Sequence, residues 1–135
     1  MPRTRLFYHF VWGTKERLPL ITDVNRQTIY GAISAKAKEM DGIVHALNGM
    51  SEHVHLVATV PPKLSLADFV GQVKGNSSHL ATHLHTPFSD KTFAWQSEYG
   101  VTTVSESHLP VVVGYVVNQQ KHHAENSLND KLEDW

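Results

Sequence analysis

Residues 52–57 read Glu52-His53-Val54-His55-Leu56-Val57, and the fold and the chemistry of the chain both follow from this stretch. Apolar residues alternate with the histidines, which is the period of a β-strand whose side chains leave alternate faces. On such a strand His53 and His55 lie side by side on one face, while Val54 and Leu56 point into the core. Two imidazoles placed in this way can bind one divalent ion and leave coordination positions open for substrate oxygens.

The pair of histidines is a weak signal when taken alone. The chain has 10 histidines among 135 residues, so roughly 0.7 such pairs are expected from composition. A second pair, His83 and His85, falls in a segment with helical periodicity, where residues two apart diverge by about 200°. Strand geometry therefore favours His53 and His55 as ligands, and the alternative is two solvent-facing strand histidines.

The segments around this strand predict an alternation of strands and helices. Expected strands cover residues 5–12, 43–50, 53–60 and 99–104. A first helix, with Asp23 as a candidate cap, is expected to run to about Met40, with an apolar stripe at Ile29, Ala32, Ile33 and Ala37. A second helix is expected from Ser65 towards Leu84, and a third, entered through Pro110, from His108 to about Asn126. The order βαββαβ predicts a single α+β domain, residues 1–135, of the ferredoxin-like type, with helices on one face of an antiparallel sheet and an added C-terminal helix.

Composition limits the classes of function. The chain has no cysteine, which excludes disulfides and thiolate metal sites, and a formal net charge of −1. We find no apolar run long enough to span a membrane and no signal peptide, so a cytoplasmic protein without a membrane partner is expected. A nucleic-acid site would have to be a local basic patch. Candidates for DNA contacts are Arg3, Arg5, Lys15 and Arg17 around the first strand, with Lys74 and Ser77 on the second helix.

The last predicted helix carries a second set of polar residues. Tyr115, Gln119 and His122 fall at i, i+4 and i+7, on one face of a helix otherwise rich in valine. Tyrosine has a pKa of about 10 and is a poor nucleophile without help. A divalent ion can supply that help at a phosphodiester, and Gln119 offers an amide oxygen as a third ligand for Mg²⁺ or Mn²⁺. The plainer interpretation is a half-buried tyrosine whose hydroxyl bonds to Gln119 or solvent.

Four further blocks of sequence, taken in order with the two histidines, resemble one family. They are YHFVWGTKER at 8–17, VKGNSS at 73–78, WQSEYGV at 95–101 and YVVNQ at 115–119. The histidine strand resembles the paired-histidine motif of the HUH endonucleases. More narrowly, nearly the whole chain resembles the small single-tyrosine transposases of bacterial insertion sequences and the REP-associated tyrosine transposases.

The resemblance implies a homodimer joined at a sheet edge, acting on single-stranded DNA with hairpin ends. It implies that His53, His55 and Gln119 hold the metal and that Tyr115 attacks a phosphate, leaving a 5′-phosphotyrosine and a free 3′-hydroxyl. No nucleotide cofactor is needed, because each transesterification conserves the energy of the phosphodiester bond in the phosphotyrosine link. In the family the tyrosine helix of one subunit often serves the histidines of the other. Asn118 and His122 are candidates to orient the ligands by contacting them without binding the ion.

Alternatives remain at this point. Glu52 stands where an aspartate is common in the family, and Thr102-Thr103 replaces a more usual aromatic and serine. The chain could also be a non-catalytic nucleic-acid-binding protein of the same fold, a metal-dependent hydrolase that uses water, or an endonuclease kept by its host that no longer mobilises an element.

Overall fold

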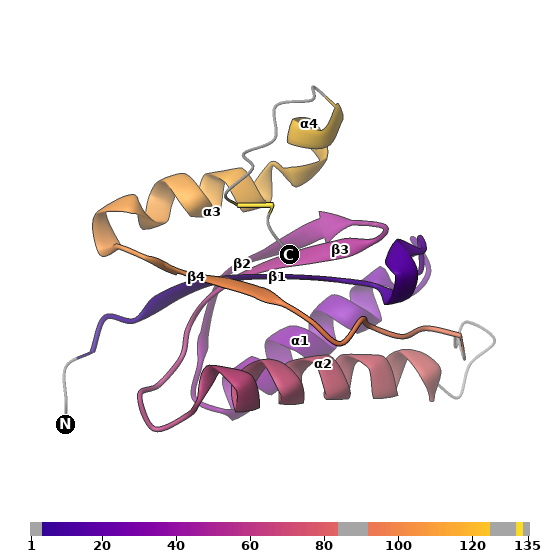
Figure 1. Cartoon of the computed structure of the whole chain (residues 1–135), viewed down its shortest axis with the longest axis horizontal. Helices are drawn as coiled ribbons and strands as arrows, with labels where there is room; N and C mark the ends of the chain where they lie inside the picture. The colour runs from indigo at the N-terminus through magenta and orange to yellow at the C-terminus, as the bar shows by residue number, and fades with distance from the viewer. Residues whose placement is uncertain (1–3, 84–91, 125–131, 134–135) are drawn as a thin grey trace.

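The computed structural model of the chain describes residues 4–83, 92–124 and 132–133 (Figure 1). Its elements follow the predicted order. In chain order they are β1 (Phe7–Gly13), the 3-10 turn η1 (Lys15–Arg17), α1 (Arg26–Glu39), β2 (Ile43–Met50), β3 (His53–Thr59), α2 (Leu66–Thr82), β4 (Gly100–Val104), the 3-10 turn η2 (Glu106–His108), α3 (Leu109–Val117) and α4 (Gln119–Ala124).

The four strands form one antiparallel sheet in the order β2-β3-β1-β4. The strand with the two histidines is therefore central: His55 lies opposite Val11 of β1 on one side and Asn48 of β2 on the other. This order is that of the ferredoxin-like fold, and the prediction of an α+β chain with an added C-terminal helix is confirmed.

Alternation along the strands divides the core into two parts. Val54, Leu56 and Phe10 are fully buried on the face covered by α1 and α2, together with the predicted stripe of α1 and with Trp12 and Phe69. Val57 lies on the other face, where it packs with Val112 and Val116 of α3. In Figure 1 the helices α1 and α2 lie on one side of the sheet, and α3 and α4 on the other. The sheet is thus covered on both faces, although helices on one face were the general expectation.

The ends of the first two helices have identifiable causes. Asp23 does not cap α1, contrary to the prediction: it forms an ion pair with Arg26, and the helix is preceded by Asn25, whose amide oxygen accepts from the backbone of Thr22 at 2.7 Å. At the other end the left-handed residue is Asp41, with φ 63°, and the amide of Gly42 donates to Ala37. The second helix begins at Ser65 as predicted, and the side chain of Ser65 caps α2 by accepting from the amide of Asp68.

The C-terminal helix is broken, which the sequence did not predict. Asn118, at φ −97° and ψ 28°, separates α3 from α4, and its side chain donates to the carbonyl of Gly114 at 2.8 Å. Such side-chain bonds to the preceding turn compete with the regular helical ladder. Pro110 opens α3 as expected, whereas the predicted end at Asn126 and the end of the second helix at Leu84 lie outside the described residues. No helix in the described ranges is long and apolar enough to cross a membrane.

Gly49 of β2 sets the close approach of β2 to the histidine strand. A Cβ at this position would lie 2.2 Å from the carbonyl oxygen of His53 and 2.8 Å from Cα of Val54. Any side chain therefore has to displace the backbone that carries the first histidine.

We expect Gly49→Ala to lower the free energy of unfolding by about 1–3 kcal/mol, as overpacking does elsewhere. Gly31 is the matched control, because it is exposed in α1 and a Cβ there meets nothing within 4 Å. Gly31→Ala should raise the same free energy by about 0.5–1 kcal/mol. Urea denaturation of both variants measures the difference, and equal effects would contradict the role given to Gly49.

Candidate metal and nucleophile site

The two strand histidines are buried beneath the C-terminal helices. Relative exposure is 2% for His53 and 0% for His55, and both lie on the sheet face covered by α3. Their rings stand edge to face with centroids 5.0 Å apart. The predicted side-by-side arrangement on one face is confirmed by this geometry, and the alternative of solvent-facing histidines is wrong.

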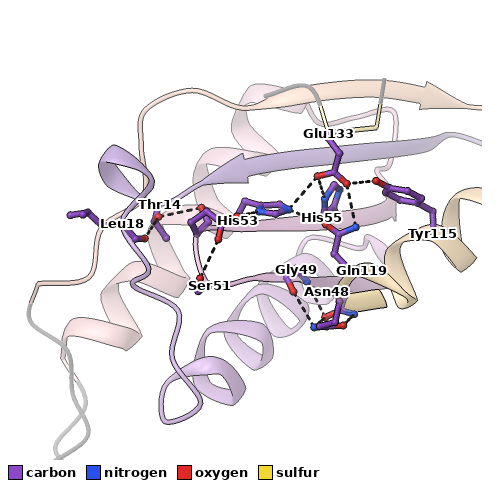
Figure 2. A network of polar contacts seen from close by, with 12 residues as sticks. Thr14, Leu18, Asn48, Gly49, Ser51, His53, His55, Tyr115, Gln119 and Glu133 are labelled. Atoms are coloured by element: carbon purple, nitrogen blue, oxygen red, sulfur yellow. Dashed lines mark hydrogen bonds and ion pairs between the residues drawn. The ribbon is translucent and has the colours of Figure 1, made fainter. Parts of the chain in front are cut away.

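A carboxylate from the C-terminal segment reaches both rings. Oε1 of Glu133 lies 3.3 Å from Nε2 of His53 and 3.1 Å from Nε2 of His55. Its other oxygen, Oε2, accepts a hydrogen bond from the hydroxyl of Tyr115 and one of 3.3 Å from Nε2 of Gln119 (Figure 2). Glu133 thus connects the histidine pair to the tyrosine.

Gln119 and Tyr115 meet the histidines from two different helices. Gln119, the first residue of α4, is fully buried, and its Oε1 lies 2.9 Å from Nε2 of His53. Tyr115 of α3 is 8% exposed, with its ring centroid 6.2 Å from that of His55. The break at Asn118 means that they do not share one continuous helical stripe, but both point into the same site of the same chain (Figure 2).

Each histidine has a partner on its second nitrogen. Nδ1 of His53 lies 2.8 Å from Oε1 of Glu52, and Nδ1 of His55 lies 2.8 Å from Nε2 of His9 on β1. The backbone carbonyl of Glu52 in turn accepts from the amide of Thr14 at 2.9 Å, which ties this turn to the end of β1. The outer nitrogens are therefore held by partners, and both Nε2 atoms face Glu133.

The environments of the two rings move their pKa values in opposite directions. Burial lowers the pKa of His53, but its hydrogen bonds with Glu133, Gln119 and Glu52 outweigh burial and raise the pKa above its ordinary value. For His55 burial prevails over the carboxylate of Glu133, so the pKa is lowered. The first ring is thus the more readily protonated of the pair.

The groups around the pair are shifted as well. Burial alone raises the pKa of Glu133, but bonds from His53, His55 and Tyr115 hold it far below its ordinary value, so the carboxylate is ionised. Burial, with His55 beside it, lowers the pKa of His9 to about 4, so this ring is neutral near pH 7.

This donor set fits a divalent ion. One nitrogen from each of His53 and His55 and one oxygen of Glu133 all lie within 4.8 Å of one another. Gln119 adds an amide oxygen at the same place. Imidazole nitrogen with carboxylate and amide oxygen suits Mn²⁺ or Mg²⁺, and the absence of cysteine from the chain removes the thiolates of closed zinc sites.

The residues of α2 expected to contact DNA both have structural partners within the chain. Nζ of Lys74 donates to the carbonyls of Gln96, at 2.7 Å, and of Glu98, and burial lowers its pKa. Ser77 is fully buried, donates to Val73 and accepts from the indole of Trp95 at 2.9 Å. These bonds join α2 to the segment before β4, on the sheet face away from the histidines, so the interpretation of Ser77 as a DNA contact is corrected.

The expected basic patch around β1 does not assemble as one cluster. Arg5 precedes the strand and pairs with Glu106 at 2.8 Å, whereas Lys15 and Arg17 lie in the turn after it. The seven residues of β1 lie between the two groups and span about 23 Å, so the groups are far apart. Arg3 and His85 lie outside the described residues. Asn118 is exposed and bonds within α3, away from the site network; His122 lies in α4, where only its backbone is described.

Sequence reasoning did not assign three residues to the site: Glu133, His9 and Glu52, whose carboxylate lies 2.8 Å from Nδ1 of His53. Glu133 is 78 positions from His55 and lies beyond the last predicted helix, so no sequence pattern indicated that it returns to the sheet. His9 is on β1, 46 positions before His55. Its signal was available: on β1 it shares a face with Val11 opposite His55, but using that signal required the strand order.

Comparison with known proteins shows the family of the chain. The family described as "Transposase IS200 like" matches residues 3–119. The ISDra2 transposase TnpA of Deinococcus radiodurans is 26% identical over 85% of this chain and 84% of its own. The transposase of insertion sequence element IS200 from Salmonella typhimurium is 29% identical over 74% of this chain and 68% of its own.

Two solved structures share the fold. The crystal structure of a Deinococcus radiodurans transposase superimposes with a TM-score of 0.64 at 28% identity, covering 88% of this chain and 98% of that one. A REP-associated tyrosine transposase bound to a REP hairpin gives a TM-score of 0.67 at 15% identity over 100% of this chain and 80% of its own. Because the family match extends across the sheet, the histidine pair and both Tyr115 and Gln119, this chain belongs to the IS200-like transposases.

Proposed function

We propose that this transposase cleaves and rejoins single-stranded DNA near hairpins through a 5′-phosphotyrosine on Tyr115, with a divalent ion at His53 and His55. The supporting observation is that the tyrosine hydroxyl and both Nε2 atoms meet at one carboxylate, Glu133. A relative of the same fold is bound to a REP hairpin, which supports hairpin DNA as the substrate class. The reaction belongs in the cytoplasm, where such DNA is found.

The proposed cleavage step is a nucleophilic attack of Tyr115 on the phosphodiester. Oη of Tyr115 forms a bond to phosphorus, the bond from phosphorus to the 3′-oxygen breaks, and a 3′-hydroxyl leaves. Oε2 of Glu133 accepts the hydrogen bond of the tyrosine hydroxyl and so orients Oη towards the phosphate. The proton of the tyrosine hydroxyl passes to the leaving 3′-oxygen, which completes the 3′-hydroxyl. The reverse step, with a 3′-hydroxyl attacking the phosphotyrosine, rejoins a strand without a nucleotide cofactor.

The proposed ligands are Nε2 of His53, Nε2 of His55 and oxygens of Gln119 and Glu133. When bound there, Mg²⁺ or Mn²⁺ would polarise the phosphodiester and stabilise negative charge on its oxygens. Glu52 and His9 hold the outer nitrogens, so the rings are oriented before any ion arrives.

The assembly proposed here is a homodimer, but the site does not require a partner subunit to supply the nucleophile. Tyr115 lies beside the histidines of its own chain, with its hydroxyl bonded to Glu133. The strands β2 and β4 are the edges of the sheet and offer the backbone groups through which a second copy would join.

The non-catalytic alternative has less support. Nucleic-acid readers of this architecture stack bases on exposed aromatic side chains of the central strands. Here both faces of the sheet are covered, by α1 and α2 on one side and by α3 on the other. Phe10 of the central strand β1 is fully buried against Phe69.

Replacement of Tyr115 by phenylalanine should abolish the covalent protein–DNA product, because it removes the only atom that bonds to phosphorus while keeping the ring. Labelled hairpin-bearing single-stranded DNA with Mn²⁺, followed by a denaturing gel, measures the product, and a binding assay should show nearly unchanged affinity. Tyr8→Phe, on the opposite face of the sheet, is the matched control and should keep the product. A covalent band that survives in Tyr115→Phe, or a free 5′-phosphate without an adduct, would overturn the proposal.

Replacement of His55 by alanine should weaken Mn²⁺ binding by about tenfold or more, since it removes one ligand from a small set. Isothermal titration measures the affinity directly, without DNA. His83→Ala is the matched control, because that histidine is exposed at the end of α2. Equal losses in both variants, or full DNA cleavage in a chelator, would remove the ion from the proposed mechanism.

Mn²⁺ affinity should fall as the pH is lowered through the raised pKa of His53. The ion needs the neutral ring, and the protonated ring is favoured by Glu133, Gln119 and Glu52 despite burial. Affinity is therefore highest above the raised pKa and is progressively lost below it. Titrations at several pH values measure the slope, which His53→Gln should flatten; a wild-type affinity that does not change between about pH 6 and 9 contradicts the prediction.

A further inference from the structure

His9 makes a buried contact with one of the two strand histidines. Its ring is 2% exposed and stacks on that of His55, with centroids 5.0 Å apart and planes 1° from parallel. Nε2 of His9 lies 2.8 Å from Nδ1 of His55. Strand register places His9 opposite Val57, two residues from His55, so the two rings are diagonal neighbours across β1 and β3.

A hydrogen bond between two neutral imidazoles needs one protonated nitrogen and one lone pair. Each neutral ring carries one proton, on either Nδ1 or Nε2. The direction of this bond therefore decides whether Nε2 of His55, the nitrogen that faces the site, carries a proton or a lone pair. The opposite nitrogen, Nε2, lies 3.1 Å from Oε1 of Glu133.

The two directions correspond to two states of the site. Without an ion, the ionised Glu133 accepts from Nε2–H of His55, so Nδ1 carries a lone pair and Nε2–H of His9 donates to it. With an ion, Nε2 of His55 must offer a lone pair, so its proton sits on Nδ1 and is donated to Nε2 of His9, whose own proton then sits on Nδ1.

We propose that His9 is a positioning residue that sets the tautomer of His55 and reverses the direction of their hydrogen bond when a metal ion binds. Each ring keeps one proton in both states, so the pair adapts to the ion without a change of charge. This inference rests on the proposed metal site at His53 and His55 and adds a residue that acts through a ligand.

The other proposed ligand, His53, has a different kind of partner on its second nitrogen. Nδ1 of His53 faces the carboxylate of Glu52 at 2.8 Å, and a carboxylate only accepts. Nδ1 of His53 is therefore protonated in both states. The imidazole of His9 can either donate or accept. The hydrogen bond between His9 and His55 can therefore reverse its direction, whereas the bond between His53 and Glu52 cannot.

Side-chain ¹⁵N NMR on the full chain tests the proposal directly, because protonated and lone-pair nitrogens of histidine have well-separated shifts. In a chelator we expect His55 to carry its proton on Nε2. With saturating Mg²⁺, which is diamagnetic, we expect the proton on Nδ1 of both His55 and His9. Unchanged tautomers of His9 and His55 in a sample shown to bind Mg²⁺ would overturn the proposal, and this test needs no variant.

Two variants give an independent measurement. His9→Phe keeps an aromatic ring of similar size but has no nitrogen, and should weaken Mn²⁺ binding by about 10–100-fold in isothermal titration. His9→Gln offers an amide that can donate or accept, and should restore affinity towards that of the wild type. A merely packing role for His9 predicts the reverse order, with phenylalanine the better substitute.

The outcomes separate this inference from the proposed function. Loss of Mn²⁺ affinity in His55→Ala with wild-type affinity in His9→Phe would overturn the role of His9 and leave the metal site intact. Unchanged affinity in His55→Ala would overturn the metal site itself, and the role of His9 with it.

Discussion

The antiparallel pairing of β3 with β1 on one side and β2 on the other is the constraint on which the site depends. Pairing on both sides fixes the pleat of the strand, so His53 and His55 face α3 while Val54 and Leu56 face α1 and α2. The same register brings His9 to the second nitrogen of His55. The core on one face thus holds the ligands in place on the other, and the rings need no flexible loop to meet.

Much of this arrangement could be predicted from local sequence. Period-two alternation identified the face of the histidine pair, because that pattern depends only on strand geometry. The buried stripe of α1 and the start of α2 at Ser65 followed from similarly local rules. The fold and the family were confirmed, and Gln119 and Tyr115 lie beside the histidines, whereas the chemical roles of these residues stay predictions.

The rest depends on contacts between distant parts of the chain. Glu133 reaches the site from 78 positions beyond His55, and no short-range pattern records such a return. At the break between α3 and α4 the side chain of Asn118 bonds to its own helix, a contact that helix periodicity does not predict. Lys74 and Ser77 looked like phosphate contacts by residue type, but packing of α2 against the segment at Trp95 engages both.

The interleaving of ligand and core residues on β3 affects how this chain can change over generations. In the four residues His53–Leu56, neighbours alternate between the proposed chemistry and the packing of the core. A substitution at Val54 or Leu56 acts on the backbone that carries the imidazoles on either side. Selection for activity and selection for stability therefore act on the same short segment. A copy that accumulates substitutions in this segment loses activity and stability together.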